Sequence, residues 1–374
     1  MNILRRLPLS RLLLLCGLVI ALGISATALA SALSTGPTPP SKPLANAVHD
    51  ALTAPPVEGV SASIQLTDHL LEGANLASGG NGGGGAAGQL ASSPLVTGAS
   101  GRMWIAKDGR VRLELQAEKG DTQVLYDGHT VSIYDASSNT LYRYTVPAGQ
   151  GDAADTSPQT SPGHHEVPTV AKIEEAISHL DHVNVSGATP TDVAGQAAYT
   201  VRVTPKEAGS LIGAGELSWD AVNGVPLRAA IYSSTSSSPT LELAATSISY
   251  GPLDSSVFNF TPPANAKIEE IVLPKKDAAQ STAPAAQGGN HPNVTTVGNG
   301  ITGVAVIESK TEEGAKQAPS TSTEGLQKVK IGGIEASELP TALGTLLSFE
   351  RSGVRYLLLG AVAPGAVENV AKGL

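Results

Sequence analysis

The stretch that decides the fold runs from residue 101 to residue 144 and reads GRMWIAKDGRVRLELQAEKGDTQVLYDGHTVSIYDASSNTLYRY. Short runs of alternating apolar and polar residues are separated by the dipeptides Asp108-Gly109, Asp127-Gly128 and Ser138-Asn139 and by Lys119-Gly120-Asp121. Because Asn, Asp and Gly tolerate the positive φ that tight hairpins require, these positions indicate turns between antiparallel strands. The stretch therefore predicts an antiparallel meander.

Alternation inside each run gives the predicted sheet two chemically different faces. Val111, Leu113 and Leu115 fall on one face, whereas Arg112 and Glu114 fall on the other, because successive side chains of a strand point to opposite sides. One face is thus aliphatic and the other faces water. We expect Leu113→Asp to abolish folding or ligand uptake and Arg112→Asp to be tolerated.

The same patterns continue on both sides of the meander. Alternating strands are predicted in GVSASIQLTD before it and in AAYTVRVTP, GELSWDAVNGVPLRAAIYS, TLELAATSISYG and VFNFTPPANAKI after it. Apolar residues at helical spacing predict one helix at residues 44–54 and another at residues 169–183. The predicted architecture is a large antiparallel sheet with helices on its inner side, over residues 44–273.

A second unit is predicted after a linker at residues 274–292, which is rich in Ala, Gln, Ser, Pro and Gly. Residues 293–374 should form a small α+β domain. It would contain strands in GITGVAVIES, LQKVKIGG and YLLLGAVA, a helix in SELPTALGTLL and a last helix in PGAVENVAKG. The apolar run YLLLGAVA is far shorter than the roughly 20 residues of a membrane span, so we expect a central buried strand with Leu357 and Leu359 in the core.

The N-terminus predicts export. Arg5, Arg6 and Arg11 precede an uncharged stretch, and Ala28-Leu29-Ala30 offers a cleavage site with small residues, so residues 1–30 resemble a signal peptide. Without cleavage, the uncharged stretch is long enough to remain as an anchor. A Pro-rich tether at residues 31–43 follows. The protein is therefore expected in an extracytoplasmic space such as the periplasm or cell envelope.

Composition and motifs exclude several function classes. A net charge of −9 with a pI near 5.4 excludes nucleic acid as a partner, and 3% aromatic residues leave few platforms for stacking bases or sugars. The sequence contains no Gly-x-Ser-x-Gly motif, and Cys16 is the single cysteine. We therefore predict no enzyme, no catalytic residues and no cofactor.

Three short motifs are expected to carry no chemistry. The segment from His179 to His182 and the run His164-His165-Glu166 lack a matched second half with metal-ligand spacing, so no metal site is predicted. The glycine run GGNGGGGAAG is not followed by Gly-Lys-Ser/Thr and is expected to be a surface loop, not a phosphate-binding loop.

A broad one-sided sheet with few helices suggests a hydrophobic cavity. Such a cavity suits acyl chains, because burial of each methylene contributes about 0.8 kcal/mol. The alternative is that the same residues close a dry core against the helices, and Trp219 and Trp104 are expected to pack in a core. The residues predicted to line the cavity are Ile64, Leu66, Ile105, Leu113, Leu115, Val131, Ile133, Leu217, Trp219, Leu241 and Leu243.

Several phrases resemble a known family. The segments LANAVHDALTAPPVEGVSASI, WIAKDGRVRLEL, VLYDGHTVSIYD and FNFTPPANA are similar to the LolA/LolB-like superfamily of extracytoplasmic lipoprotein carriers. This resemblance implies an unclosed β-barrel with a helical lid and a cavity for lipid or an acylated lipoprotein. No cavity arginine of such carriers can be matched to this sequence, so no functional residue is transferred.

The final segment resembles a different family. The phrases VGNGITGVAVIES and YLLLGAVAPGAVENVAKGL are similar to the small C-terminal domain of the RseB/MucB sigma-factor regulators, which follows a LolA-like domain in that family. Two functions remain open. The first is a non-catalytic carrier of acyl chains, and the alternative is an envelope-stress sensor that binds a membrane-spanning anti-sigma factor or another envelope protein.

Overall fold

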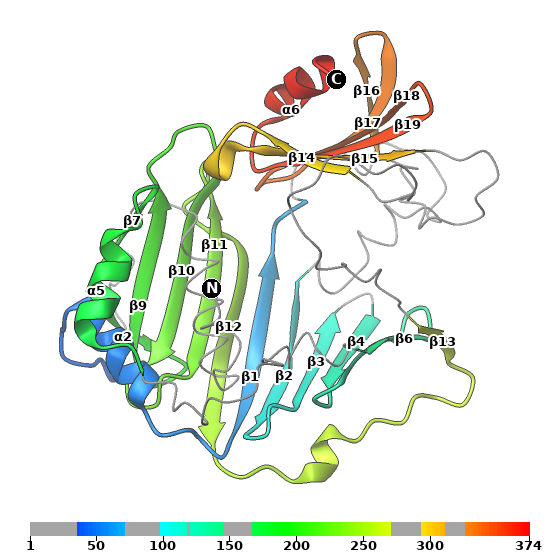
Figure 1. The fold of residues 1–374 in the computed structure, drawn as a ribbon. Coiled ribbons are helices and arrows are strands. Elements are labelled where there is room, and N and C mark those ends of the chain that lie inside the picture. Colours follow the sequence, from blue (N-terminus) through cyan, green and yellow to red (C-terminus); the bar gives the residue numbers. More distant parts are fainter. Residues whose placement is uncertain (1–35, 72–97, 118–119, 146–166, 271–292, 311–325) are drawn as a thin grey trace, which may run out of the picture. The chain divides into compact units, whose positions relative to one another are not determined.

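The structure is a computed structural model that describes residues 36–71, 98–117, 120–145, 167–270, 293–310 and 326–374. Two compact units account for these residues, and each has its own sheet (Figure 1). The larger unit holds strands β1 to β13 with helices α2 and α5, and the smaller holds β14 to β19 with α6. Several predicted features lie outside the described residues: the signal peptide or anchor, the first part of the tether, the glycine run, the linker and His164-His165-Glu166.

The larger unit is built almost entirely from strands. Its helices are α2 (Leu44–Thr53), α5 (Val170–Ser178) and the short 3-10 helix η2 (Ser255–Phe258). Its strands are β1 (Gly59–Asp68), β2 (Ala99–Ala106), β3 (Val111–Ala117), β4 (Gly120–Tyr126), β5 (Thr130–Asp135), β6 (Thr140–Thr145), β7 (Val183–Val185), β8 (Thr189–Val193), β9 (Gln196–Pro205), β10 (Ile212–Asp220), β11 (Pro226–Ser233), β12 (Pro239–Tyr250) and β13 (Lys267–Glu270).

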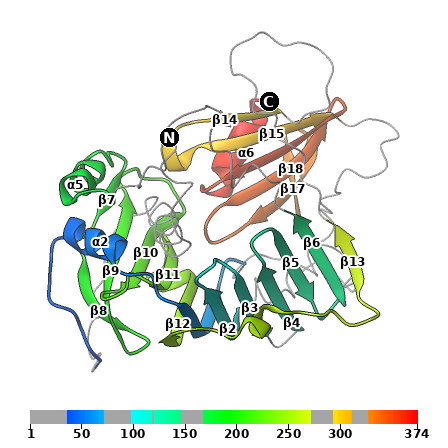
Figure 2. The same ribbon diagram turned by 60° about the horizontal axis from the view of Figure 1, so that its bottom comes forward.

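These strands form one sheet, which has 13 strands within the described residues. The order is β13-β6-β5-β4-β3-β2-β1-β12-β11-β10-β9-β7, and β8 also pairs with β9. All pairs are antiparallel except β13 with β6. The end strands β13 and β7 are not paired with each other, so the sheet is not closed into a barrel, and Figure 2 shows it curving along this order.

The predicted hairpin turns at Asp108-Gly109, Asp127-Gly128 and Ser138-Asn139 are confirmed, whereas the turn predicted at Lys119 begins outside the described residues. Gly109 has φ 90° and Gly128 has φ 103°, and Asn139 reaches φ 47° at the turn between β5 and β6. At Gly224, in the turn between β10 and β11, an added Cβ would lie 2.5 Å from the backbone oxygen of Ala51. A side chain there would push α2 away from the sheet, so this turn requires glycine for close packing as well as for its φ of 70°.

Both predicted helices are confirmed and pack against one end of the sheet. Pro55 and Pro56 follow α2 and cannot continue its hydrogen bonds, and the Thr169 hydroxyl caps α5 by accepting a hydrogen bond from the Lys172 N–H. Their apolar residues join β9 and β10 in one buried cluster. This cluster contains Ala45, Ala47, Val48, Ala51, Leu52, Ile173, Ala188, Tyr199, Val201, Leu217 and Trp219.

The strand predicted across residues 257–268 is mostly wrong. After β12 the chain forms a strap, defined here as residues 251–266, which includes η2, and only Lys267–Glu270 forms the edge strand β13. Pro262 and Pro263 have no N–H to donate to a neighbouring strand, which explains why pairing begins only after them.

The smaller unit contains one sheet covered by one helix. Its order is β14-β15-β19-β18-β17-β16, all antiparallel. The elements are β14 (Asn293–Val297), the 3-10 helix η3 (Gly300–Thr302), β15 (Val304–Lys310), β16 (Gln327–Ile331), β17 (Ile334–Pro340), β18 (Thr345–Arg351), β19 (Val354–Gly360) and α6 (Pro364–Lys372). The expected last helix is confirmed, and so is the central position of the closing strand, because β19 lies between β15 and β18.

The helix predicted at residues 337–347 is wrong, because this segment forms the hairpin of β17 and β18. Leu339 and Leu347 do fit a helical spacing, but Pro340 and Gly344 interrupt it, and the Thr341 N–H donates to the Gly344 carbonyl in a tight turn. The apolar residues instead alternate along two strands.

The register expected for the closing strand is also wrong. Leu358 is fully buried in the core of the smaller unit, whereas Leu359 is 38% exposed and Leu357 is half-buried. The three consecutive leucines hide the alternation, so the sequence alone does not determine which of them faces α6. No helix among the described residues is long and apolar enough to cross a membrane.

Candidate functional site

The eleven residues predicted to line a cavity all lie on one face of the larger sheet, called the aliphatic face here. Cross-strand pairing connects them in rows. Leu113 pairs with Met103 and Val124, and Val124 pairs with Ile133, while Leu66 pairs with Leu243. Pairs keep their side chains on the same side of a sheet, so these rows form one continuous surface.

Part of the aliphatic face is covered. Trp219 and Leu217 lie beneath α2 and α5 and are 0% and 1% exposed. Ile64 and Leu115 are also fully buried, in a second cluster with Ala62 and Ala99. These four predicted cavity residues therefore belong to packed core in this structure.

The remaining part of the aliphatic face is accessible. Leu243 is 37% exposed, and Ala229, which lies beside it on β11, is exposed too. The other predicted cavity residues are half-buried: Leu66, Ile105, Leu113, Val131, Ile133 and Leu241. Because α2 and α5 pack on β9 and β10, the apolar surface of β11, β12 and β1 to β5 extends beyond the two helices.

The opposite face, called the polar face here, carries a ladder of charges at its β9–β12 end. Glu216 accepts hydrogen bonds from Arg202 at 2.6 Å, Arg228 at 2.7 Å and the Tyr232 hydroxyl at 2.7 Å. Arg228 also binds Glu242 at 2.5 Å. Burial acts to raise the pKa of Glu216, but the donors from Arg228, Tyr232 and Arg202 outweigh it and leave this pKa below its usual value. These contacts join β9, β10, β11 and β12, and the carboxylates of the ladder are bound by its own arginines.

Arg112 lies on the polar face, as its register predicts, but it is not free in water. Its guanidinium donates to the carbonyl of Val257 at 2.7 Å and to that of Asn259 at 3.2 Å, and it pairs with Glu114 at 2.5 Å. Arg112 therefore fastens the strap to the sheet. The expectation that Arg112→Asp is tolerated does not follow from this geometry.

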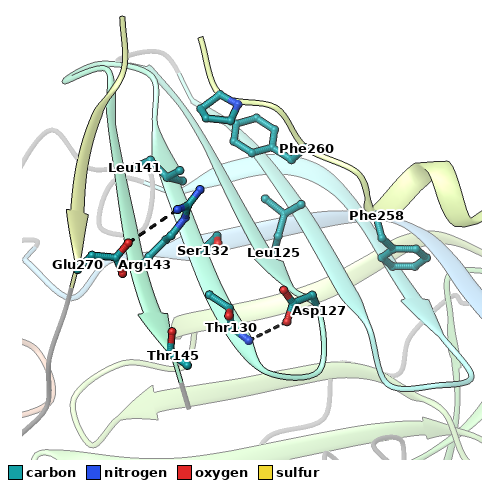
Figure 3. Close-up of a pocket in the computed structure, with 11 residues that line it drawn as sticks. Leu125, Asp127, Thr130, Ser132, Leu141, Arg143, Thr145, Phe258, Phe260 and Glu270 are labelled. Carbon is teal, nitrogen blue, oxygen red and sulfur yellow. Dashed lines mark hydrogen bonds and ion pairs between the residues drawn. The ribbon is translucent and has the colours of Figure 1, made fainter. Parts of the chain in front are cut away.

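A pocket of about 410 Å³ lies on the polar face, between the sheet and the strap (Figure 3). Leu125 and Leu141 contribute its apolar floor from β4 and β6. The strap contributes Phe258, Phe260 and Pro262, and the polar groups come from Asp127, Thr130, Ser132, Arg143, Thr145 and Glu270. Figure 3 shows Arg143 and Glu270 facing each other across β6 and β13, 3.8 Å apart.

Sequence reasoning missed this pocket because it assigned the strap to a regular strand. A usable signal was present: FNFTPP brings two aromatic residues and two prolines together in a chain with only three Phe. The prolines exclude a paired strand, so aromatic residues beside them were candidates for a wall that packs over the sheet.

The histidine motif that is described lies on the surface of the larger unit. His182 and His179 are exposed, and His182 Nδ1 lies 3.2 Å from Glu207 Oε1. Among the residues that the structure describes, no three His, Cys, Asp or Glu side chains are grouped closely enough to hold a metal ion.

Comparison with known protein families gives a match over part of the chain. A family model described as "Predicted periplasmic protein (DUF2092)" matches residues 89–171. No curated protein matches the sequence.

Solved structures similar to this chain include the MucA/MucB complex of Pseudomonas aeruginosa, with 15% identity, a TM-score of 0.40 and coverage of 88% of this chain and 94% of that one. A putative outer membrane lipoprotein-sorting protein domain from Vibrio parahaemolyticus has 8% identity, a TM-score of 0.20 and coverage of 54% and 89%. An uncharacterized conserved protein from Thermus thermophilus has 11% identity, a TM-score of 0.34 and coverage of 60% and 98%. The resemblance expected from the sequence is confirmed, since a MucB structure and a lipoprotein-sorting domain are both among these proteins.

Proposed function

We propose that this chain is an exported, non-catalytic protein of the cell envelope that holds acyl chains of a lipid or lipoprotein against its aliphatic face. The observation that carries the proposal is the accessible aliphatic surface around Leu243, which is 37% exposed in the middle of the sheet. Aliphatic residues in the interior of a large sheet are ordinarily covered, and contiguous exposed apolar surface marks an interaction site.

The chemistry of this surface favours an acyl chain over a polar ligand. Each buried methylene contributes about 0.8 kcal/mol, so a long chain supplies on the order of 10 kcal/mol before the costs of ordering it. Leu243 pairs with Leu66 on β1 and with Ala229 on β11. The next pairs along these strands join Leu241 to Ile231 and to Asp68, so the surface around Leu243 is aliphatic apart from one carboxylate at its end. The N-terminal segment resembling a signal peptide supports a location outside the cytoplasm.

Uptake of a C16 fluorescent fatty acid by the purified mature chain tests the proposal. Leu243→Glu should weaken uptake at least tenfold, because a carboxylate placed against the acyl chain loses its hydration. The side chain is already partly exposed, so the fold should tolerate the change. Ser247→Glu is the matched control, since Ser247 is exposed on the same strand but its pairing with Ser63 places it on the polar face. No uptake by the wild-type protein, or equal loss in both variants, would contradict the proposal.

The sensor alternative has its own supporting observation, an apolar hollow of about 540 Å³ in the smaller unit that Ile301, Leu343, Leu346 and Leu359 help to line. A sensor should bind the exported segment of a membrane-spanning anti-sigma factor. Crosslinking in the absence of lipid distinguishes the two functions, because a carrier should yield no such complex.

A further inference from the structure

The pocket on the polar face is held open by contacts on both of its sides, and it is distinct from the aliphatic face. On one side, Arg112 holds the strap at Val257, and the Arg110 guanidinium lies 4.7 Å from the centre of the Phe258 ring. On the other side, the Asn139 side-chain amide donates to the Asn265 carbonyl at 3.0 Å. These contacts fix the strap at both ends of the pocket.

The pocket also places two of the three Phe residues of the chain in one wall. Phe260 packs against Tyr134, with ring centres 5.4 Å apart, which leaves its orientation fixed by the sheet. With Leu125 and Leu141 in the floor, the pocket offers rigid apolar surface to the body of a ligand. The low aromatic content of the sequence suggested few stacking platforms, but the fold brings two aromatic residues into one pocket wall.

The polar groups of the pocket supply donors and acceptors together. Arg143 can only donate, the carboxylates of Asp127 and Glu270 can only accept when ionised, and the hydroxyls of Ser132 and Thr145 can do both. Asp127 Oδ1 accepts hydrogen bonds from the N–H groups of His129 at 2.8 Å and Thr130 at 2.7 Å. Burial acts to raise its pKa, but these backbone donors prevail and lower it, so Asp127 remains ionised at neutral pH.

This mixture of charges excludes the simplest ligands. Two carboxylates against one guanidinium repel an anion, and a cation finds only Asp127 as a partner, because Glu270 already pairs with Arg143. An acyl chain would remove water from charged groups without replacing its hydrogen bonds, which is costly. A neutral ligand that is rich in hydroxyl groups and has apolar C–H faces can form hydrogen bonds with the polar lining groups and pack against the apolar floor and wall.

We propose that this pocket binds a neutral saccharide of one or two sugar rings, with a ring face against the Phe260 side of the wall and its hydroxyls bonded to Arg143, Ser132 and Asp127. The volume of about 410 Å³ lies at the small end of the roughly 300–1,000 Å³ typical of small-molecule pockets. The proposal is independent of acyl-chain binding, because the pocket and the surface around Leu243 lie on opposite faces of the sheet.

Saturation-transfer NMR on the full mature chain with maltose, cellobiose and N,N′-diacetylchitobiose tests this inference. At least one of these disaccharides should receive saturation, strongest at the ring protons of one face. Arg143→Gln should weaken binding at least fivefold. Arg102→Gln should leave it unchanged, because Arg102 is an exposed arginine on the polar face of β2, away from the pocket. Fatty-acid uptake measured on the same samples should be unchanged in both variants.

Three results would overturn the inference. The first is no transfer to any of the three disaccharides from a wild-type sample that retains its folded spectrum. The second is transfer that is equal in the wild-type protein and in Arg143→Gln. Binding of the tripeptides Lys-Gly-Lys or Glu-Gly-Glu that is tighter than that of all three sugars, and lost in Arg143→Gln, would assign the pocket to a charged peptide and would also contradict the proposal.

Discussion

Glu338 in the smaller unit offers a quantitative test of the packing. It lies on β17 opposite Leu347, on the face that α6 covers, and it is only 3% exposed. Its Oε1 atom is buried with no hydrogen-bond partner. Burial, with a smaller contribution from Glu368 on α6, raises the pKa of Glu338 above its ordinary value of 4.5. On α6, Lys372 lies 3.9 Å from Glu368.

Glu338→Gln removes the charge and keeps the size of the side chain. Because the folded state holds the proton more tightly than the unfolded state, the wild-type unit loses stability as the pH rises from 4.5 through the raised pKa. A buried unsatisfied group costs about 1–3 kcal/mol. The variant should therefore match the wild type near pH 4 and exceed it by about 1–3 kcal/mol at pH 7. In a unit of this size, 1 kcal/mol corresponds to about 4–8 °C in Tm.

Calorimetry of the full chain from pH 4 to pH 8 measures this effect, and hydrogen exchange in residues 334–340 and 364–372 locates it. Glu335→Gln is the matched control, because Glu335 is on the same strand with a side chain that is 69% exposed. A parallel pH profile for wild type and Glu338→Gln, or a variant that is less stable at pH 7, would show that the carboxylate has a compensating partner and would refute the reasoning.

The larger unit gives three further predictions. Leu115→Ala should lower the free energy of unfolding by about 2–5 kcal/mol, because the side chain is 1% exposed, and urea titration measures it; a loss under about 1 kcal/mol would contradict close packing. Arg112→Ala should speed hydrogen exchange in η2 by releasing Val257, and unchanged exchange there would show that the strap does not need this anchor. Glu216→Gln should lower the free energy of unfolding by about 1.5–3 kcal/mol at pH 7, because the Arg228 guanidinium loses a charged partner. The difference in stability between wild type and variant should shrink as the pH falls below 4.5. The lowered pKa of Glu216 stabilises the folded state fully above pH 4.5, and this stabilisation is lost as the pH falls through the lowered pKa. A pH-independent difference in urea titrations would exclude the assigned role.

Much of the larger sheet was predictable because its signals are local. Turn residues such as Asp108-Gly109 and Asn223-Gly224 fix where the chain reverses, and strict alternation around Leu113 fixes which side chains share a face. The eleven predicted residues consequently lie on a single face. The sequence could not separate Trp219, which α2 and α5 bury, from Leu243, which they leave accessible, because that difference depends on where two helices dock.

The errors occurred where local patterns are ambiguous. In the smaller unit, Leu339 and Leu347 fit a helix, and three consecutive leucines at Leu357 to Leu359 fit either register of a strand. Cross-strand pairing decides both cases, because burial of Leu347 and Leu358 against α6 outweighs the local spacing. The local preference of a segment for helix or strand is therefore a weaker determinant of its structure than packing between distant residues.

By itself, the sequence determined the signal-peptide pattern at the N-terminus, the antiparallel meander, the two chemically different faces of the large sheet and the presence of a second unit, because each depends on residues close together in the chain. Only the tertiary structure decided which part of the aliphatic face stays accessible, and only it brought Arg143 of β6 together with Phe260 of the strap. These groups are separated by more than a hundred residues, and no local pattern records the path of the strap that joins them. Contacts between distant parts of the chain therefore form the pocket, whereas local sequence patterns specify the strands and turns of the sheet.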